Sequence, residues 1–338
     1  MGAGAGHAPV RYSCAFPPGI DVTGKAMCAE RLGYHRVWVL ESPAAYGDLW
    51  VALARIAQAT ERIGLATGVA IPGLRHPMVT ASAIGSVHEL APGRLAVAFG
   101  TGYTGRITLG QRPVRWAEVA RYVRQVRALL HGELAEVDGQ LCQMMHEPGF
   151  APGRPIDVPL WIAASGPRGL AAARELGAQG VVVTTIPPEG TPGWADCALL
   201  RFGTVLRPGE DHTSPRVMQA AGPGYASTVH ATWQHAGNAV DAVPGGAQWR
   251  AALEAQRPES QRHLIAHAGH LQLLTGRDRG LVAAAGPAIL EAGWTGDPHS
   301  VRDRIDQASA AGITEIIYVP AGPDIDSELE AFAMAAGS

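Results

Sequence analysis

The chain alternates between short apolar runs and longer segments in which apolar residues recur every three or four positions. The runs have the length and composition of strands, and they are almost continuously apolar, as in a parallel sheet that is buried on both faces. Eight runs are predicted to be strands, at residues 10–16, 36–40, 63–71, 93–100, 159–165, 180–185, 216–222 and 314–322.

Segments with helical spacing follow most of these runs. Asp48 is expected to cap the second of them and His76 the third. About eight β units separated by helices favour a (β/α)8 TIM barrel of the α/β class over an open sheet. No low-complexity linker divides residues 1–338, so a single barrel domain is expected. The predicted helices cover residues 23–33, 48–60, 77–90, 116–132, 167–177 and 326–336.

Residues 186–300 form a longer stretch than one or two βα units need. This stretch is rich in Gly, Pro and His. We expect it to hold extra helices that form a lid beside the last strands.

Composition narrows the function classes. Of the 338 residues, 47% are hydrophobic and 17% are charged, with a formal net charge of −3, so neither nucleic acid nor an anionic membrane is an expected partner. Lys25 is the only lysine, which nearly excludes lysine Schiff-base chemistry. No apolar run is long enough to span a bilayer, the first ten residues do not resemble a signal peptide, and the four cysteines are scattered, so a reduced cytoplasmic enzyme is expected.

The segment 99–105, FGTGYTG, contains the spacing G-x-G-x-x-G. In a dinucleotide-binding fold this motif follows the first strand and opens a helix directly. Here it follows the fourth strand, and the next helix is expected only at Trp116. We therefore favour another interpretation, in which glycines at the end of a barrel strand let a flat ring system lie close to the backbone.

Several segments in order resemble one family. They are AERLGYHRVWVLE, IAQATERIGLATGV, RHPMVTASAIGSVHELAPGRLAVAFGTG, VPLWIAASGPRGLAAARELGAQGVVV and ITEIIYVPAGPDIDSELEAFA. Together they are similar to the bacterial luciferase-like superfamily of flavin-dependent monooxygenases and deazaflavin (coenzyme F420)-dependent oxidoreductases, such as methylenetetrahydromethanopterin reductase. The resemblance implies a (β/α)8 barrel that holds the cofactor ring at its C-terminal mouth, and often a homodimer.

Two loops are candidate cofactor sites. The loop with Ala164, Ser165, Gly166 and Arg168 offers a hydroxyl, a helix N-terminus and a guanidinium, which together suit an anion. The resemblance implies that this loop holds the cofactor phosphate or the adjoining side chain, whereas the simpler interpretation is an ordinary N-cap serine. It also implies a non-proline cis peptide at Gly68–Val69, pressed against the ring, where a plain buried strand glycine is the alternative.

Candidate catalytic residues follow the second and fourth strands. Thr101 and Gly102 are expected to contact the cofactor, and Tyr103 to donate a proton or to stack. Glu41 matches an acid that the family's deazaflavin enzymes place near the ring, or it is a solvated loop carboxylate. Ser42 stands where the family's dehydrogenases have a histidine, so the base that alcohol oxidation needs is missing.

Three histidines, His263, His267 and His270, have the i, i+4, i+7 spacing of one helical face. Three imidazoles on one face suit a metal ion. However, no carboxylate joins them at a matching spacing, and the family that the chain resembles uses no metal ion. We therefore expect no metal and interpret this face as a lining of the lid or the substrate pocket.

These observations favour a coenzyme F420-dependent oxidoreductase that transfers a hydride from reduced deazaflavin to a C=C or C=N bond of a small organic substrate. The alternative is an FMN-dependent monooxygenase that uses O₂. A non-catalytic barrel that has lost cofactor binding is a third hypothesis, against which Gly68, Thr101, Ser165 and Gly166 argue.

Overall fold

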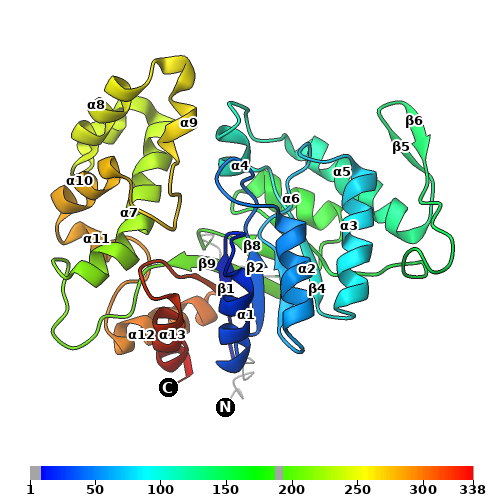
Figure 1. The fold of residues 1–338 in the computed structure, drawn as a ribbon, viewed down its shortest axis with the longest axis horizontal. Coiled ribbons are helices and arrows are strands. Elements are labelled where there is room, and N and C mark those ends of the chain that lie inside the picture. Colours follow the sequence, from blue (N-terminus) through cyan, green and yellow to red (C-terminus); the bar gives the residue numbers. More distant parts are fainter. Residues whose placement is uncertain (1–8, 187–192, 338) are drawn as a thin grey trace, which may run out of the picture.

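The computed structural model of the protein describes residues 9–186 and 193–337. Eight parallel strands close into a barrel in the order β1-β10-β9-β8-β7-β4-β3-β2, which confirms the predicted (β/α)8 architecture (Figure 1). The strands are β1 Arg11–Phe16, β2 Arg36–Val39, β3 Gly64–Thr67, β4 Leu95–Phe99, β7 Leu160–Ala163, β8 Gly180–Val183, β9 Asp196–Phe202 and β10 Glu315–Val319.

The barrel interior is filled by two indole rings set among small side chains. Trp38 and Trp161 meet edge to face with ring centroids 5.5 Å apart, and alanines of four strands pack with them. At the amino ends of the strands, the buried carboxylate of Glu315 accepts hydrogen bonds from Trp38 Nε1 at 2.8 Å and from Arg36 at 3.2 Å. The barrel interior is therefore a packed core, as is usual for this architecture.

Helices cover the outside of the barrel. Asp48 accepts hydrogen bonds from the amides of Trp50 and Val51, and His76 Nδ1 accepts one from Met78 N at 3.1 Å, so both predicted caps are confirmed. Each cap satisfies a backbone donor that a helix start leaves without an intrahelical partner. The covering helices are α1 Val22–Arg31, α2 Leu49–Ala59, α3 Pro77–Leu90, α5 Trp116–His131, α6 Pro167–Glu175, α12 Pro298–Ala310 and α13 Ile325–Gly337.

The seventh strand is not where the sequence pattern predicted it. Residues 216–222 belong to α7, Pro215–Ala236, and the strand is β9, which begins twenty residues earlier. The run passes for a strand because it is apolar and is followed by Pro223. Its buried positions, however, continue at helical spacing to Val229 and face other helices instead of a sheet.

Extra helices between β9 and α12 form a bundle with its own apolar core, as predicted for residues 186–300. We call residues 215–292 the helical insertion; it stands to one side of the barrel, on the left in Figure 1. After α7 it comprises the 3-10 turns η1 Gly237–Ala242 and η2 Glu259–Gln261 and the helices α8 Gly246–Gln256, α9 His263–Ala266, α10 Gly276–Ala285 and α11 Ala288–Glu291.

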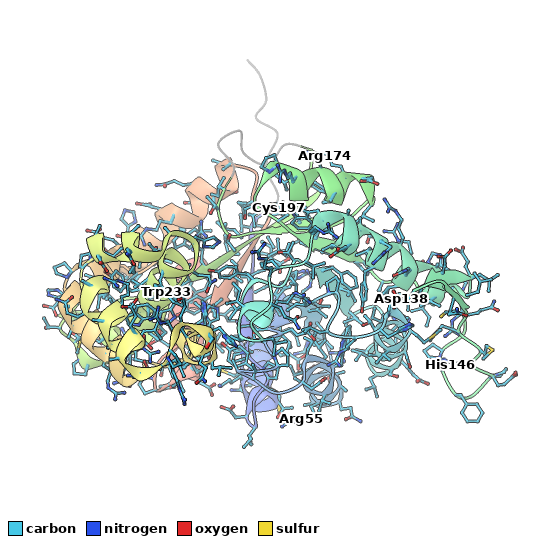
Figure 2. The ribbon with its side chains drawn as sticks, turned by 90° about the horizontal axis from the view of Figure 1, so that it is seen from above. Arg55, Asp138, His146, Arg174, Cys197 and Trp233 are labelled. Carbon is cyan, nitrogen blue, oxygen red and sulfur yellow. The ribbon has the colours of Figure 1, made fainter. Side chains whose placement is uncertain are left out.

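A hairpin lies at the opposite end of the molecule. It consists of β5 Ala135–Val137 and β6 Gln140–Cys142, and Figure 2 shows its Asp138 far from Trp233 of the helical insertion. The insertion is therefore the only one of these two additions that stands beside the barrel mouth. Among residues 9–186 and 193–337, no helix is both long enough and apolar enough to cross a membrane.

Candidate active site

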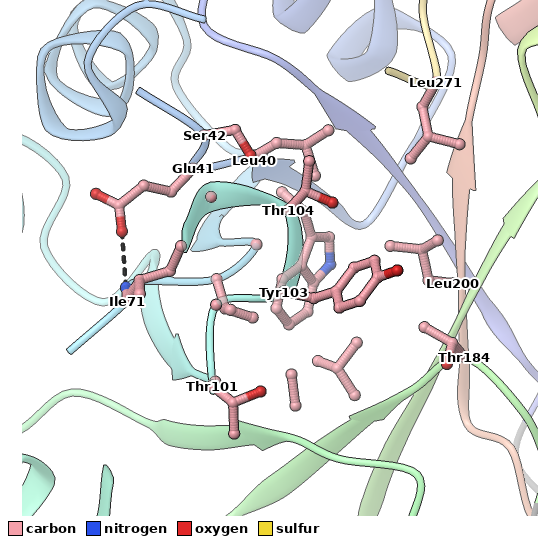
Figure 3. A pocket seen from close by; sticks show the side chains of 18 of the residues that line it. Leu40, Glu41, Ser42, Ile71, Thr101, Tyr103, Thr104, Thr184, Leu200 and Leu271 are labelled. Atoms are coloured by element: carbon pink, nitrogen blue, oxygen red, sulfur yellow. Dashed lines mark hydrogen bonds between the residues drawn. The ribbon is translucent and has the colours of Figure 1, made fainter. Parts of the chain in front are cut away.

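A pocket of ≈ 320 Å³ opens at the carboxyl ends of the strands (Figure 3). Its walls come from the loops after β2, β3, β4, β7 and β8, and the helical insertion adds His270 and Leu271. Parallel strands end at the same edge of a barrel, so residues distant in sequence converge there. Of the predicted site residues, all line this pocket except Gly166 and Arg168.

The bond Gly68–Val69 is a cis peptide, as the resemblance implied. β3 ends just before it, and there the hydroxyl of Thr67 both donates to Ala98 O and accepts from Ala98 N, each at 2.8 Å. The side chain thus satisfies the backbone of β4 where the strand pairing is interrupted. Beyond the cis bond, Ala70 N resumes the pairing by donating to Ala98 O at 2.8 Å.

The glycines of the segment 99–105 make room for other side chains of the same protein. A Cβ on Gly100 would lie 2.8 Å from Val69 Cγ2, and one on Gly102, whose φ is +76°, would overlap Ile71 Cγ2. A Cβ on Gly105 would lie 2.5 Å from Ile71 Cδ1. Close packing thus requires all three glycines, and the closed barrel excludes the dinucleotide-binding fold.

A short helix, α4 Tyr103–Ile107, begins immediately after these glycines. The expectation that the next helix starts only at Trp116 was therefore wrong. The sequence YTGRI is too short to show helical spacing, and its Gly105 disfavours a helix by propensity. Tertiary packing on Ile71 overrides that propensity and aims Tyr103 into the pocket.

Glu41 is a buried acid on the pocket wall. Its Oε2 accepts a hydrogen bond from Ile71 N at 2.7 Å, and Arg75 Nε lies 3.9 Å from its Oε1. Burial outweighs these contacts and raises the pKa of Glu41 to about 7. The interpretation as a solvated loop carboxylate was wrong, because 9% of the residue is exposed. A carboxyl with this pKa exchanges protons near neutral pH.

Tyr103 projects into the centre of the pocket in Figure 3. Its ring stacks on that of His235 from α7, with centroids 5.1 Å apart and an interplanar angle of 1°. Burial raises the pKa of Tyr103 to about 12, so the phenol keeps its proton at neutral pH. It is therefore a hydrogen-bond donor held between the barrel and the helical insertion.

The loop after β7 only partly matches the predicted anion site. Ser165 Oγ accepts a hydrogen bond from Thr184 N at 2.9 Å, and the cap of α6 is Gly166, so Ser165 is not an N-cap residue. Ala164 and Ser165 line the pocket, whereas Gly166 and Arg168 are exposed and lie outside its lining.

The positive charge near this loop comes from another strand. Arg201 at the end of β9 donates to Thr184 O at 2.7 Å, and Thr184 Oγ1 lies 3.2 Å from Ser165 Oγ. Sequence reasoning missed Arg201 because β9 itself was missed. A single arginine in the apolar strand DCALLRF was the available signal.

The three histidines of the supposed helical face are not on one helix. α9 ends at Ala266, and His263 lies beside Gly110 and is not part of the cluster that the other two form. His267 and His270 instead meet His230 of α7, which sequence spacing could not reveal. Burial lowers the pKa of His267 to about 4 and that of His270 to about 3, so both rings are neutral at neutral pH.

Comparison with known proteins shows to which family this barrel belongs. A model of the luciferase-like monooxygenase family matches residues 21–315. The chain belongs to the luciferase-like monooxygenase family. The match runs from the first helix of the barrel to its last strand, which agrees with the resemblance noted in the sequence.

Two curated relatives are oxidoreductases by name, and the name of one of them states a dependence on F420. The chain is 29% identical over 179 residues to a 5,10-methylenetetrahydromethanopterin reductase of Methanolobus tindarius, covering 51% of this chain and 52% of the relative. It is 30% identical over 179 residues to an F420-dependent glucose-6-phosphate dehydrogenase of Beutenbergia cavernae, covering 46% and 50%. The chain thus spans about half the length of the curated relatives that it matches.

Solved structures share the fold over nearly the whole chain. A coenzyme F420-dependent tetrahydromethanopterin reductase from Methanopyrus kandleri superposes with a TM-score of 0.65 at 20% identity, covering 97% of this chain and 98% of that one. A monooxygenase from Streptomyces bottropensis gives a TM-score of 0.60 at 18% identity, covering 96% and 98%. At this identity the superpositions establish the fold alone.

Proposed function

We propose that this protein is an oxidoreductase that binds coenzyme F420 without a covalent bond and transfers a hydride from the reduced deazaflavin to a C=C or C=N bond of a small organic substrate. The observation that carries the proposal is the presence of two proton-bearing groups in the lining of one pocket. They are the buried Glu41, with a pKa near neutrality, and the protonated phenol of Tyr103.

The pocket suits a flat aromatic ring. Its walls include Leu40, Val69, Ala163, Val182 and Ile317, which are apolar and come from five different strands or strand ends. Gly68 and Gly100 also line this surface, and the side chain of Val69 packs against Gly100. An apolar slot with a few polar groups at its edge is the usual form of a cofactor site.

Polar groups at one edge of the pocket suit the phosphate-bearing side chain of the cofactor. Ser165 and Thr184 present hydroxyls there. Arg201 lies just behind this lining and donates a hydrogen bond to Thr184 O. A guanidinium beside two hydroxyls offers charge-assisted hydrogen bonds to a phosphate oxygen. This assignment gives Arg201 the role that the sequence suggested for Arg168.

A bound deazaflavin supplies a carbon that carries hydride and reacts slowly with O₂. In this site Tyr103 donates the proton that the substrate needs once it has accepted hydride, and His235 behind the ring holds the phenol in place. Glu41 restores or accepts protons near pH 7. Ser42 is no base at neutral pH, so the site favours reduction over the oxidation of an alcohol.

A binding and turnover experiment tests this proposal. Purified protein is titrated with F420 and, separately, with FMN, and the fluorescence of each cofactor is followed. We expect tight binding of F420, weak binding of FMN, and no O₂ consumption coupled to substrate turnover. Tight FMN binding with transfer of ¹⁸O from ¹⁸O₂ to the product supports the monooxygenase alternative instead, and binding of neither cofactor supports a non-catalytic barrel.

We also propose that the protein acts as a homodimer on a small molecule in the cytoplasm, as the family resemblance implies. Light scattering of the purified protein measures the mass of the assembly. A mass near 35.3 kDa, that of one chain, contradicts the dimer.

A further inference from the structure

Three histidines of the helical insertion converge next to the pocket. His230 lies in the second half of α7, and His267 and His270 lie in the turn between α9 and α10. One ring nitrogen of each residue lies within 4.8 Å of the corresponding nitrogens of the other two. The rings of His230 and His267 are 5.7 Å apart by their centroids, and those of His267 and His270 are 5.9 Å apart.

His267 has no hydrogen-bond partner among residues 9–186 and 193–337. Only 2% of this residue is exposed, yet both Nδ1 and Nε2 are buried without a partner. Burying a polar nitrogen without a partner is unfavourable, and most such groups in native proteins are satisfied. The two unpartnered nitrogens therefore point to a ligand between the rings.

His230 is oriented as metal-binding histidines commonly are. Its Nε2 lies 3.0 Å from the buried Asp278, which also accepts a hydrogen bond from Trp249 Nε1 at 2.9 Å. A carboxylate at Nε2 keeps the proton there and leaves Nδ1 with its lone pair, and Nδ1 has no partner. A carboxylate behind a histidine fixes the ring and raises its basicity as a ligand.

His270 connects this cluster to the barrel. Its Nε2 lies 3.2 Å from Thr104 Oγ1 of α4, and the hydroxyl of Tyr46 donates to its backbone carbonyl. Its Nδ1 lies 3.5 Å from Ser227 Oγ, which is long for a hydrogen bond. An ion held by the three rings would join α7, the turn 267–270 and, through Thr104, the wall of the pocket.

We propose that His230, His267 and His270 bind a divalent transition-metal ion of the zinc type and that this ion fastens the turn 267–270 to α7 beside the pocket. Three imidazole rings suit zinc, cobalt, nickel or copper ions, whereas magnesium and calcium require oxygen ligands. The proposal departs from the expectation of no metal, which concerned His263 together with His267 and His270. It does not depend on the proposed F420 chemistry.

Cobalt(II) and zinc(II) are the probes that test this site. Chelator-treated protein is titrated with cobalt, whose visible absorption strengthens in a tetrahedral nitrogen site, and zinc is then added to displace it. We expect one ion per chain in the wild type and the loss of this stoichiometric binding in His267→Gln and in His230→Gln. The matched control is His263→Gln, four residues from His267 and outside the cluster, which keeps the full stoichiometry.

A second measurement covers variants that fail to fold. If zinc binds only the native state, the melting temperature of the wild type must rise as the zinc concentration rises. Zinc must also slow hydrogen exchange in the turn 267–270. Neither cofactor nor substrate is present, so a failure here leaves the proposed function untouched. The metal site is ruled out by a wild type that takes up no stoichiometric ion, or by a folded His267→Gln variant that binds cobalt as well as the wild type.

Discussion

The barrel and the helical insertion contribute to the same pocket in different ways. The barrel supplies Glu41, Tyr103 and Ser165 from strand ends and the short α4, each held by backbone contacts of its neighbours. The insertion supplies His235, which stacks on Tyr103, and the turn with His270. The barrel therefore holds the groups that can react, and the insertion positions one of them and adds His270 and Leu271 to the lining.

This division matches how the two regions are built. Barrel strands are paired on both sides and packed on both faces, which fixes their ends within the sheet. The insertion is a bundle with a separate core, so its side chains reach the pocket from a body that is packed independently of the barrel. Chemistry on the rigid region and recognition on the separate one is a common arrangement among barrel enzymes.

The largest expected effect comes from comparing kcat in a variant of Tyr103 with kcat in a variant of His235, its stacking partner from the insertion. Tyr103→Phe removes the proposed proton donor, so it should lower kcat by about 10²–10⁴-fold. The Kd for F420 should change little. His235→Leu removes only the stacked support and should lower kcat by less than tenfold. Steady-state kinetics with fluorescence titration measures both, and equal losses in the two variants would contradict the division.

The next largest effect is expected at Ser165. Ser165→Asp places a carboxylate where the cofactor phosphate is proposed to lie, and like-charge juxtaposition costs several kcal/mol, or at least about 100-fold in Kd. Thermal melting should be little changed. Ser86→Asp on the exposed face of α3 adds the same charge elsewhere and serves as the control. Unaltered F420 affinity in folded Ser165→Asp refutes the phosphate site.

Variants of two arginines test which of them contributes to F420 binding at the pocket edge formed by Ser165 and Thr184. Arg201→Met removes charge-assisted hydrogen bonds worth about 1.5–3 kcal/mol and should weaken F420 binding by about 10–100-fold. Arg168→Met, on the exposed start of α6, should change the Kd less than twofold. Titrations at two salt concentrations check both. A larger effect at Arg168 would restore the assignment made from the sequence.

Per pH unit, the smallest effect is the pH dependence of stability at Glu41. The folded protein raises this pKa from 4.5 to about 7, so it binds the proton that the unfolded chain releases. The resulting stability is full below pH 4.5 and is lost as the pH rises to 7, by up to about 1.4 kcal/mol per pH unit. Denaturant unfolding at pH 5, 6, 7 and 8 should show this loss in the wild type relative to Glu41→Gln, whereas parallel curves contradict the raised pKa.

The sequence was most informative where local pattern and strand ends decide the structure. Short apolar runs followed by capped helices predicted seven of the eight strands and the caps at Asp48 and His76. Since strand ends in a barrel share one mouth, the order of the strands was enough to place Glu41, Gly68 and Tyr103 together.

The insertion was predictable as extra helices but not in its details. Residues 216–222 are apolar in a way that fits either a strand or one face of a buried helix, and only their packing against α10 and α11 decides. The meeting of His230 with His267 depends on contacts between residues that lie far apart in the chain. No spacing rule reaches that far, so the sequence grouped His267 with the wrong neighbour.

Ile71 links three features of this protein that an engineer would otherwise treat separately. Its side chain occupies the spaces beside Gly102 and Gly105, and its amide holds Glu41. A larger residue at either glycine would push on Ile71 and thereby move the acid, even though neither glycine carries a reactive group. Libraries that aim at a new substrate should therefore leave 71, 102 and 105 untouched and vary Leu200 and Leu271, which line the pocket from β9 and from the insertion.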